Sequence, residues 1–106
     1  MRVLFDQGTP VPLRDHLSHH SIRTAFELGW SALENGELLA RAEAEGFEAL
    51  VTTDRNLKYQ QNLSDRRIAI VVLSTTSWPR IQASAPLVLR AIESAVPGGY
   101  AEVPIP

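Results

Sequence analysis

The stretch Phe47-Glu48-Ala49-Leu50-Val51-Thr52-Thr53-Asp54 decides the fold. Its apolar centre is short and continuous, a pattern typical of a buried strand, and an aspartate follows directly. Val3-Leu4-Phe5-Asp6 near the start of the chain repeats this arrangement, an apolar run of strand length that ends in an aspartate. We therefore expect two buried strands, each with a carboxylate at its carboxyl end.

Segments with helical patterns separate these strands. A short helix is predicted after Pro10, to about Leu17, because proline fits the first turn of a helix. The alanine-rich run from Glu37 to Glu45, with Asn35 as a candidate N-cap and Gly46 as its stop, predicts a second helix. Two further helices are expected, a short one at 56–62 and an amphipathic one that begins at Pro79 and extends to Ile92.

Three more segments have the character of strands. Near alternation of apolar and polar residues predicts a half-buried strand from Ile22 to Phe26, and the β-branched run from Arg67 to Leu73 predicts a buried one. Tyr100 to Ile105 contains a proline that only an edge strand tolerates. This alternation of strands and helices predicts an α/β chain of one domain, residues 1–106, with a three-layer α/β/α fold and a mainly parallel central sheet.

Composition narrows the function classes. The chain has 106 residues, 44% of them hydrophobic, a net charge of −2 and no cysteine. Disulfides and thiolate sites are thus absent, and the charge is not that of a protein that holds nucleic acid by phosphate contacts alone. Asp6 interrupts the first apolar run too early for a signal peptide, and the longest run, Ile68 to Leu73, is far shorter than the roughly 20 residues of a membrane span. We expect a cytoplasmic protein that does not enter membranes.

The two strand-end aspartates are the main candidates for chemistry. In an open α/β sheet the ligand site lies beyond the carboxyl ends of the strands, so Asp6 and Asp54 would lie near each other. Two adjacent carboxylates repel unless a cation or a proton lies between them. The alternative is that each aspartate caps the turn that follows its strand.

Magnesium or manganese would require a third oxygen ligand, because both ions prefer hard ligands and high coordination numbers. Glu37, in the first turn of the alanine-rich helix, is the candidate, and Glu34 is its rival. A glutamate in the first turn also interacts favourably with the helix dipole, so Glu37 has a structural explanation that needs no metal.

Three segments together resemble a known family: Val3-Leu4-Phe5-Asp6, Asn35-Gly36-Glu37-Leu38-Leu39-Ala40-Arg41-Ala42 and Leu50-Val51-Thr52-Thr53-Asp54-Arg55-Asn56-Leu57. From Arg2 to about Leu73 the chain is similar to the short bacterial PIN-like domains, relatives of the PIN-domain ribonuclease toxins. The resemblance implies a PIN-like fold and an Mg²⁺- or Mn²⁺-dependent endoribonuclease, with Asp6, Glu37 and Asp54 as catalytic metal ligands and Thr52 as a supporting residue. It also implies an RNA substrate, an antitoxin protein as partner and a possible homodimer.

Two departures from the family pattern leave a second function open. Many short relatives carry acidic residues where this chain has Gln7 and Asn56. An amide oxygen can coordinate a hard cation but brings no charge, so these positions would support a metal only weakly. The alternative function is therefore a binding module with a degraded site, which acts through protein or RNA contacts without cutting.

Other surfaces of the chain suggest partners. Arg55, Lys58 and Tyr59 combine positive charge with an aromatic ring, as in proteins that bind single-stranded RNA, although they also suit an ordinary solvated surface. Leu87 and its neighbours Val88 and Ile92 could form a dimer interface or belong to the core.

A receiver-like phosphoacceptor domain is a further alternative. It would require an acidic pair after the first strand and a lysine after the last one. The chain has Asp6-Gln7 after the first strand and Ser74-Thr75 after the strand that ends at Leu73. The sequence therefore disfavours it.

Overall fold

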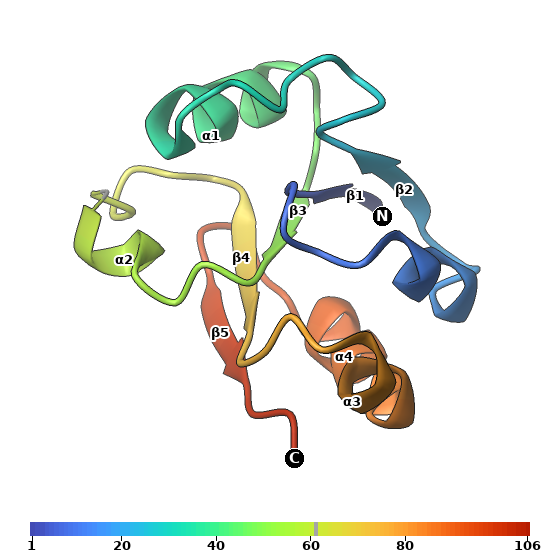
Figure 1. Ribbon diagram of the computed structural model, residues 1–106. Helices are drawn as coiled ribbons and strands as arrows, with labels where there is room; N and C mark the ends of the chain where they lie inside the picture. The colour runs from blue at the N-terminus through green and yellow to red at the C-terminus, as the bar shows by residue number, and fades with distance from the viewer. Residues whose placement is uncertain (61) are drawn as a thin grey trace.

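Five parallel strands form one sheet in the computed structural model, which describes residues 1–60 and 62–106. The strands are β1 (Arg2–Phe5), β2 (Ser21–Thr24), β3 (Ala49–Thr52), β4 (Ala69–Leu73) and β5 (Tyr100–Val103), in the order β2-β1-β3-β4-β5 (Figure 1). They are joined by the 3₁₀ helix η1 (Val11–His16) and the α-helices α1 (Asn35–Ala44), α2 (Leu57–Gln60), α3 (Trp78–Ala83) and α4 (Ala85–Glu93). The predicted α/β class and parallel sheet are confirmed.

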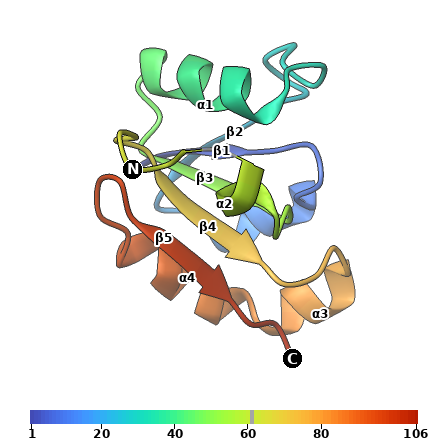
Figure 2. The same cartoon turned by 90° about the vertical axis from the view of Figure 1, so that its left-hand side faces the viewer.

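The sheet separates two apolar cores, because successive side chains of a strand point to opposite faces. Val3, Phe5 and Val51 face one core with η1, α3 and α4, while Leu4 and Leu50 face the other with α1 and α2. Figure 2 shows α1 on one side of the sheet and α4 on the other. The arrangement is that of a three-layer α/β/α fold.

The strand order reverses direction between β1 and β3. From β1 the chain crosses to the edge strand β2, whereas from β3 it continues in the opposite direction to β4. Phe5 lies opposite Val51 in the parallel register, so the residues that follow the two strands emerge side by side. Such a switch point is where open α/β sheets bind ligands.

Strand β2 differs from its prediction. It covers Ser21 to Thr24 rather than Ile22 to Phe26, and the side chain of Phe26 is 77% exposed instead of half-buried. The hydroxyl of Thr24 accepts a hydrogen bond from the backbone N–H of Glu27 (3.0 Å), and the Glu27 carboxylate accepts one from the backbone N–H of Thr24 (2.8 Å). These two bonds close a turn that ends the strand early.

The last predicted helix is two helices. Helix α3 ends at Ala83 and α4 begins at Ala85, with Ser84 between them at φ −112° and ψ 17°. Pro86 has no N–H to donate to the carbonyl of Gln82, so a continuous helix would lose a hydrogen bond at this point. The prediction of one helix overlooked this break.

The other elements agree with the sequence in type. The short helix predicted after Pro10 is the 3₁₀ helix η1. Helix α2 covers Leu57–Gln60 rather than 56–62, and residue 61 of that prediction lies outside the described residues. Strand β5 lies at the edge of the sheet as expected, although it ends at Val103 rather than Ile105.

Helix α4 supplies core residues along one face. Val88 and Ile92 are completely buried within the chain, whereas Leu87 is 38% exposed. Of the three residues considered for a dimer interface, two therefore belong to the protein's own core.

Candidate functional site

Strands β1 and β3 place Asp6 and Asp54 at the switch point of the sheet. The backbone N–H of Asp6 donates to the carbonyl of Val51 (3.1 Å), which continues the β1–β3 pairing one residue past β1. Asp54 follows β3 two residues after Thr52. Both aspartates are partly exposed, and the negative charge of Asp54 acts on Asp6. The structure thus brings together two of the three predicted ligands.

Three donors surround the carboxylate of Asp6. Its Oδ1 accepts hydrogen bonds from the backbone N–H of Gly8 (3.2 Å) and the hydroxyl of Thr9 (2.8 Å), and its Oδ2 accepts one from the hydroxyl of Thr52. The Thr9 hydroxyl also lies 2.9 Å from the carbonyl oxygen of Val51. A carboxylate offers about four lone-pair positions, so Asp6 retains roughly one for a further ligand.

Burial dominates the ionisation of Asp6. It raises the pKa of Asp6 above the ordinary value of 3.8, and the negative charge of Asp54 adds to the rise. The hydrogen bonds from Thr52, Thr9 and Gly8 favour the carboxylate and oppose this effect. A cation bound at this place would compensate both the burial and the repulsion.

Each carboxylate oxygen of Asp54 accepts a hydrogen bond. Its Oδ1 accepts the backbone N–H of Asn56 (3.0 Å), which closes a local turn, and its Oδ2 accepts the side-chain amide of Asn35 from the start of α1 (2.9 Å). The backbone N–H of Asp54 in turn donates to the hydroxyl of Thr52 (3.0 Å). By the same count of lone pairs, about two acceptor positions of Asp54 remain for a ligand.

Asn35 has a different role from the predicted one. Helix α1 begins at Asn35 itself, and Glu34 is the N-cap, whose side chain makes no capping hydrogen bond within the described residues. The Asn35 amide contacts the Asp54 carboxylate instead, so an expected cap is part of the site. The sequence signal for this contact was weak, because asparagine before a helix is explained most simply as a cap.

Thr9 is a second site residue that the sequence argument missed. Its side chain is buried, at 3% exposure, and its hydroxyl contacts Asp6. The spacing Asp6-Gln7-Gly8-Thr9 is typical of turns in which an aspartate accepts hydrogen bonds from the residues that follow it. This spacing could have indicated the contact.

The predicted third ligand occupies the first turn of α1, close in sequence to Asn35. Glu37 and its rival Glu34 are both exposed. Within residues 1–60 and 62–106 no three histidine, aspartate or glutamate side chains gather closely enough to hold a metal ion. The role of Glu37 as a ligand stays a prediction.

Gln7 and Asn56 are the two amides that the sequence resemblance placed at acidic positions. Gln7 is exposed and lines two small cavities with Asp6, of about 250 and 160 Å³. Asn56 is exposed as well, and its backbone N–H contacts Asp54. Gln7 is adjacent to Asp6 in the chain, and Asn56 lies two positions after Asp54.

The predicted RNA-binding residues surround a cavity of about 460 Å³ next to Asn56. Arg55, Lys58 and Tyr59 line it with Glu102 of β5. The Lys58 ammonium lies 2.9 Å from the Glu102 carboxylate, an interaction that raises the pKa of Lys58 and lowers that of Glu102. Tyr59 is 78% exposed. The structure gathers these residues, but Glu102 offsets the charge of Lys58.

Comparisons with protein-family models, with curated proteins and with solved structures found no match for this chain. Among the described residues, no helix has both the length and the apolar character needed to cross a bilayer.

Proposed function

We propose that the chain is a PIN-like ribonuclease that depends on Mg²⁺ or Mn²⁺ and cuts single-stranded RNA. One observation carries the proposal: the carboxylates of Asp6 and Asp54 emerge from adjacent strands at the switch point, and the Thr52 hydroxyl contacts both residues. The resemblance of the three sequence segments to short bacterial PIN-like domains supports the same function.

The residues present suit a hard divalent cation. Asp6 and Asp54 would hold it through the carboxylate lone pairs that the surrounding donors leave available. Glu37 would supply a third carboxylate. When bound, such an ion activates water and offsets charge on a phosphodiester in the transition state.

The protein's own side chains fix the geometry of this chemistry. Thr52 orients Oδ2 of Asp6, while Asn35 and the Asn56 backbone orient Asp54. Carboxylates that hydrogen bonds already orient suit catalysis, because they need little reorganisation when a ligand binds. Arg55, exposed beside Asp54, would attract the phosphate backbone of the substrate.

Calorimetric titration with MnCl₂ and MgCl₂ tests the metal site. We expect binding to the native chain and its loss in Asp6→Asn and Asp54→Asn. Asp65→Asn is the matched control, because Asp65 is exposed and precedes β4, at the amino end of that strand and not at the carboxyl ends where the site lies. Glu37→Gln decides the third ligand: a large loss of affinity supports Glu37, and native affinity removes it from the site.

Cleavage of 5′-labelled single-stranded RNA in MnCl₂ tests the activity. The native chain and Asp65→Asn should cut, whereas Asp6→Asn and Asp54→Asn should not. All variants must first give the native circular dichroism spectrum and remain folded under the assay conditions. Equal cleavage by native chain and both site variants would trace the activity to a contaminant and overturn the proposal.

A binding module without catalysis is the second candidate. It is favoured by the amides Gln7 and Asn56 at family acidic positions and by the lack of a cluster of three acidic side chains within the described residues. RNA or protein binding that needs no divalent ion, together with no cleavage, would support this function. An antitoxin protein and a homodimer remain proposals for its partners.

A further inference from the structure

Phe26 is an exposed aromatic side chain next to the candidate site. Its side chain is 77% exposed, and that of Val11 nearby in the same cavity lining is 53% exposed. The cavity of about 250 Å³ that both residues line also contains Asp6 and Gln7. An apolar ring and a candidate metal ligand therefore face the same hollow in the surface.

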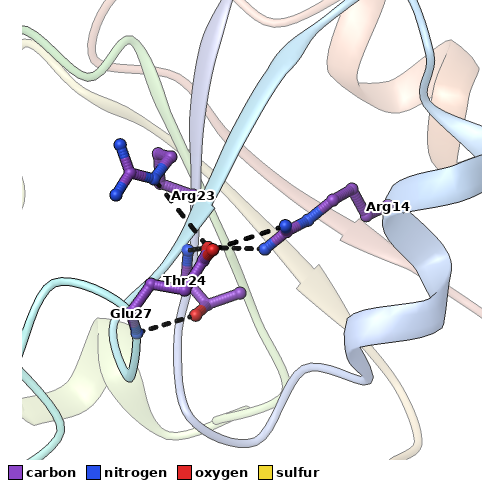
Figure 3. A network of polar contacts seen from close by, with 4 residues as sticks. All are labelled: Arg14, Arg23, Thr24 and Glu27. Atoms are coloured by element: carbon purple, nitrogen blue, oxygen red, sulfur yellow. Dashed lines mark hydrogen bonds and ion pairs between the residues drawn. The ribbon is translucent and has the colours of Figure 1, made fainter.

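Several polar contacts hold the turn that carries Phe26. Glu27 and Thr24 exchange two hydrogen bonds across it, and the guanidinium of Arg14 contacts the Glu27 carboxylate at 2.5 Å (Figure 3). The backbone N–H of Ala25 donates to the carbonyl of Phe5 in β1 (2.9 Å). A ring on such a fixed turn loses little conformational freedom when a ligand contacts it.

The position of Phe26 suits a strand of nucleic acid that passes over the aspartates. Strand β2 lies beside β1 and parallel strands are spaced by about 4.8 Å, so the turn after β2 lies roughly one strand spacing from the end of β1. Arg55 and Tyr59 lie on the other flank, beyond β3. A chain that contacts both flanks would cross Asp6 and Asp54.

We propose that Phe26 is the stacking platform for an unpaired base of the RNA strand, one that lies beside the phosphate at the Asp6 and Asp54 centre. The inference rests on the proposed function and adds a base-binding subsite to it. Unpaired bases stack on exposed aromatic rings, and polar groups at the rim hydrogen-bond to base edges. The amide of Gln7 provides a donor and an acceptor in the same cavity.

The lining favours a base over an apolar protein segment. Apart from Phe26 and Val11, the side chains around this cavity are polar or charged. A stable protein interface would cover about 800 Å² on each partner, with an apolar centre. The two apolar side chains of this cavity are too few to form such a centre.

The test measures binding separately from cleavage. Fluorescence anisotropy with a labelled oligouridylate, in CaCl₂ in place of MgCl₂, compares the native chain with Phe26→Ala, Phe26→Trp and Val96→Ala. Val96 is the matched control because it is 60% exposed but lines a different cavity, with Met1 and Pro97. We expect Phe26→Ala to raise the Kd by roughly 5- to 150-fold, the effect of one lost base stack. Phe26→Trp and Val96→Ala should keep the native Kd.

An oligouridylate with a single abasic position gives a second readout. The abasic probe should bind the native chain more weakly than the intact one, and Phe26→Ala should no longer distinguish the two probes. A native Kd for Phe26→Ala, or no oligouridylate binding by the native chain, would overturn the proposal. So would a dimer that Phe26→Ala dissociates while the RNA affinity stays unchanged, because Phe26 would then be a protein contact.

Failure of the proposed function would look different. If the native chain neither binds Mn²⁺ nor cuts RNA but Phe26→Ala still weakens oligouridylate binding, the nuclease assignment fails and the base platform stands. If the native chain cuts RNA and Phe26→Ala changes neither Kd nor KM, the nuclease stands and the platform fails.

Discussion

The hydroxyl of Thr52 donates a hydrogen bond to the carboxylate of Asp6 and accepts one from the backbone N–H of Asp54. Thr52 is the last residue of β3 and is 1% exposed, so its side chain has no alternative partner in water. One buried hydroxyl therefore links the carboxylate of one candidate ligand to the backbone of the other.

Thr52→Val should destabilise the protein. Valine keeps the shape but removes the hydroxyl, which leaves Asp6 without one donor and the Asp54 N–H without its acceptor. We expect a loss of about 1–3 kcal/mol in the free energy of unfolding, measured in urea. Thr52→Ser keeps the hydroxyl and is the control, since its loss should be smaller. Native stability of Thr52→Val would show that the two hydrogen bonds contribute nothing and would contradict the prediction.

Asp6 should make stability fall as the pH rises. Its raised folded pKa means that between pH 3.8 and that pKa the native state holds a proton that the unfolded chain has released. The free energy of unfolding of the native chain, minus that of Asp6→Asn, should decrease across this window and become constant above it. Urea unfolding in EDTA at a series of pH values measures the difference, and an increase with pH would contradict the prediction.

Glu43 should produce the opposite pH dependence. Burial raises the pKa of Glu43, but hydrogen bonds from Arg66 and from the backbone N–H groups of Arg67 and Ile68 outweigh it and hold the pKa below 4.5. This stability is present above pH 4.5 and is lost as the pH falls through the lowered pKa.

Glu43→Gln isolates that contribution. We expect a loss of about 1.5–3 kcal/mol at pH 7, the range for hydrogen bonds to a charged group. The difference between the native chain and the variant should shrink below pH 4.5. Glu45→Gln is a control on the same helix end, because the Glu45 side chain is exposed. A constant difference across pH would contradict the prediction.

Helix α4 offers a test of the dimer interpretation. Val88→Ala should cost roughly 1–3 kcal/mol of stability, because Val88 is completely buried and the substitution leaves a cavity. Leu87→Ala should change stability by less than about 0.5 kcal/mol if Leu87 faces only solvent. Sedimentation of native chain and Leu87→Ala completes the test: a dimer that Leu87→Ala dissociates would assign this exposed leucine to an interface.

The sequence predicted those parts of the fold that depend on local pattern. Continuous apolar runs identified β1, β3 and β4, because both faces of a central parallel strand are buried and no polar residue interrupts it. The same patterns placed Asp6 and Asp54 at strand ends. Adjacency of their strands was inferred from the fold class and is confirmed by the β1–β3 pairing.

The parts that the sequence did not predict depend on side-chain contacts between distant segments. The alternation around Ile22 continues to Phe26, and nothing local shows that Thr24 and Glu27 close a turn. The sequence around Asn35 predicted a helix cap, but the Asn35 amide contacts Asp54, 19 positions away. Such contacts follow from how the layers pack and cannot be obtained from periodicity.

Helix α1 connects the carboxyl end of β3 with the amino end of β4. It begins at Asn35, which contacts Asp54 beyond the carboxyl end of β3, and in its last turn Glu43 holds the segment that enters β4. Ten residues of helix span about 15 Å and do not stretch. We therefore expect that a substitution which displaces the Glu43 end of α1 also shifts the contact between Asn35 and Asp54, a whole helix away.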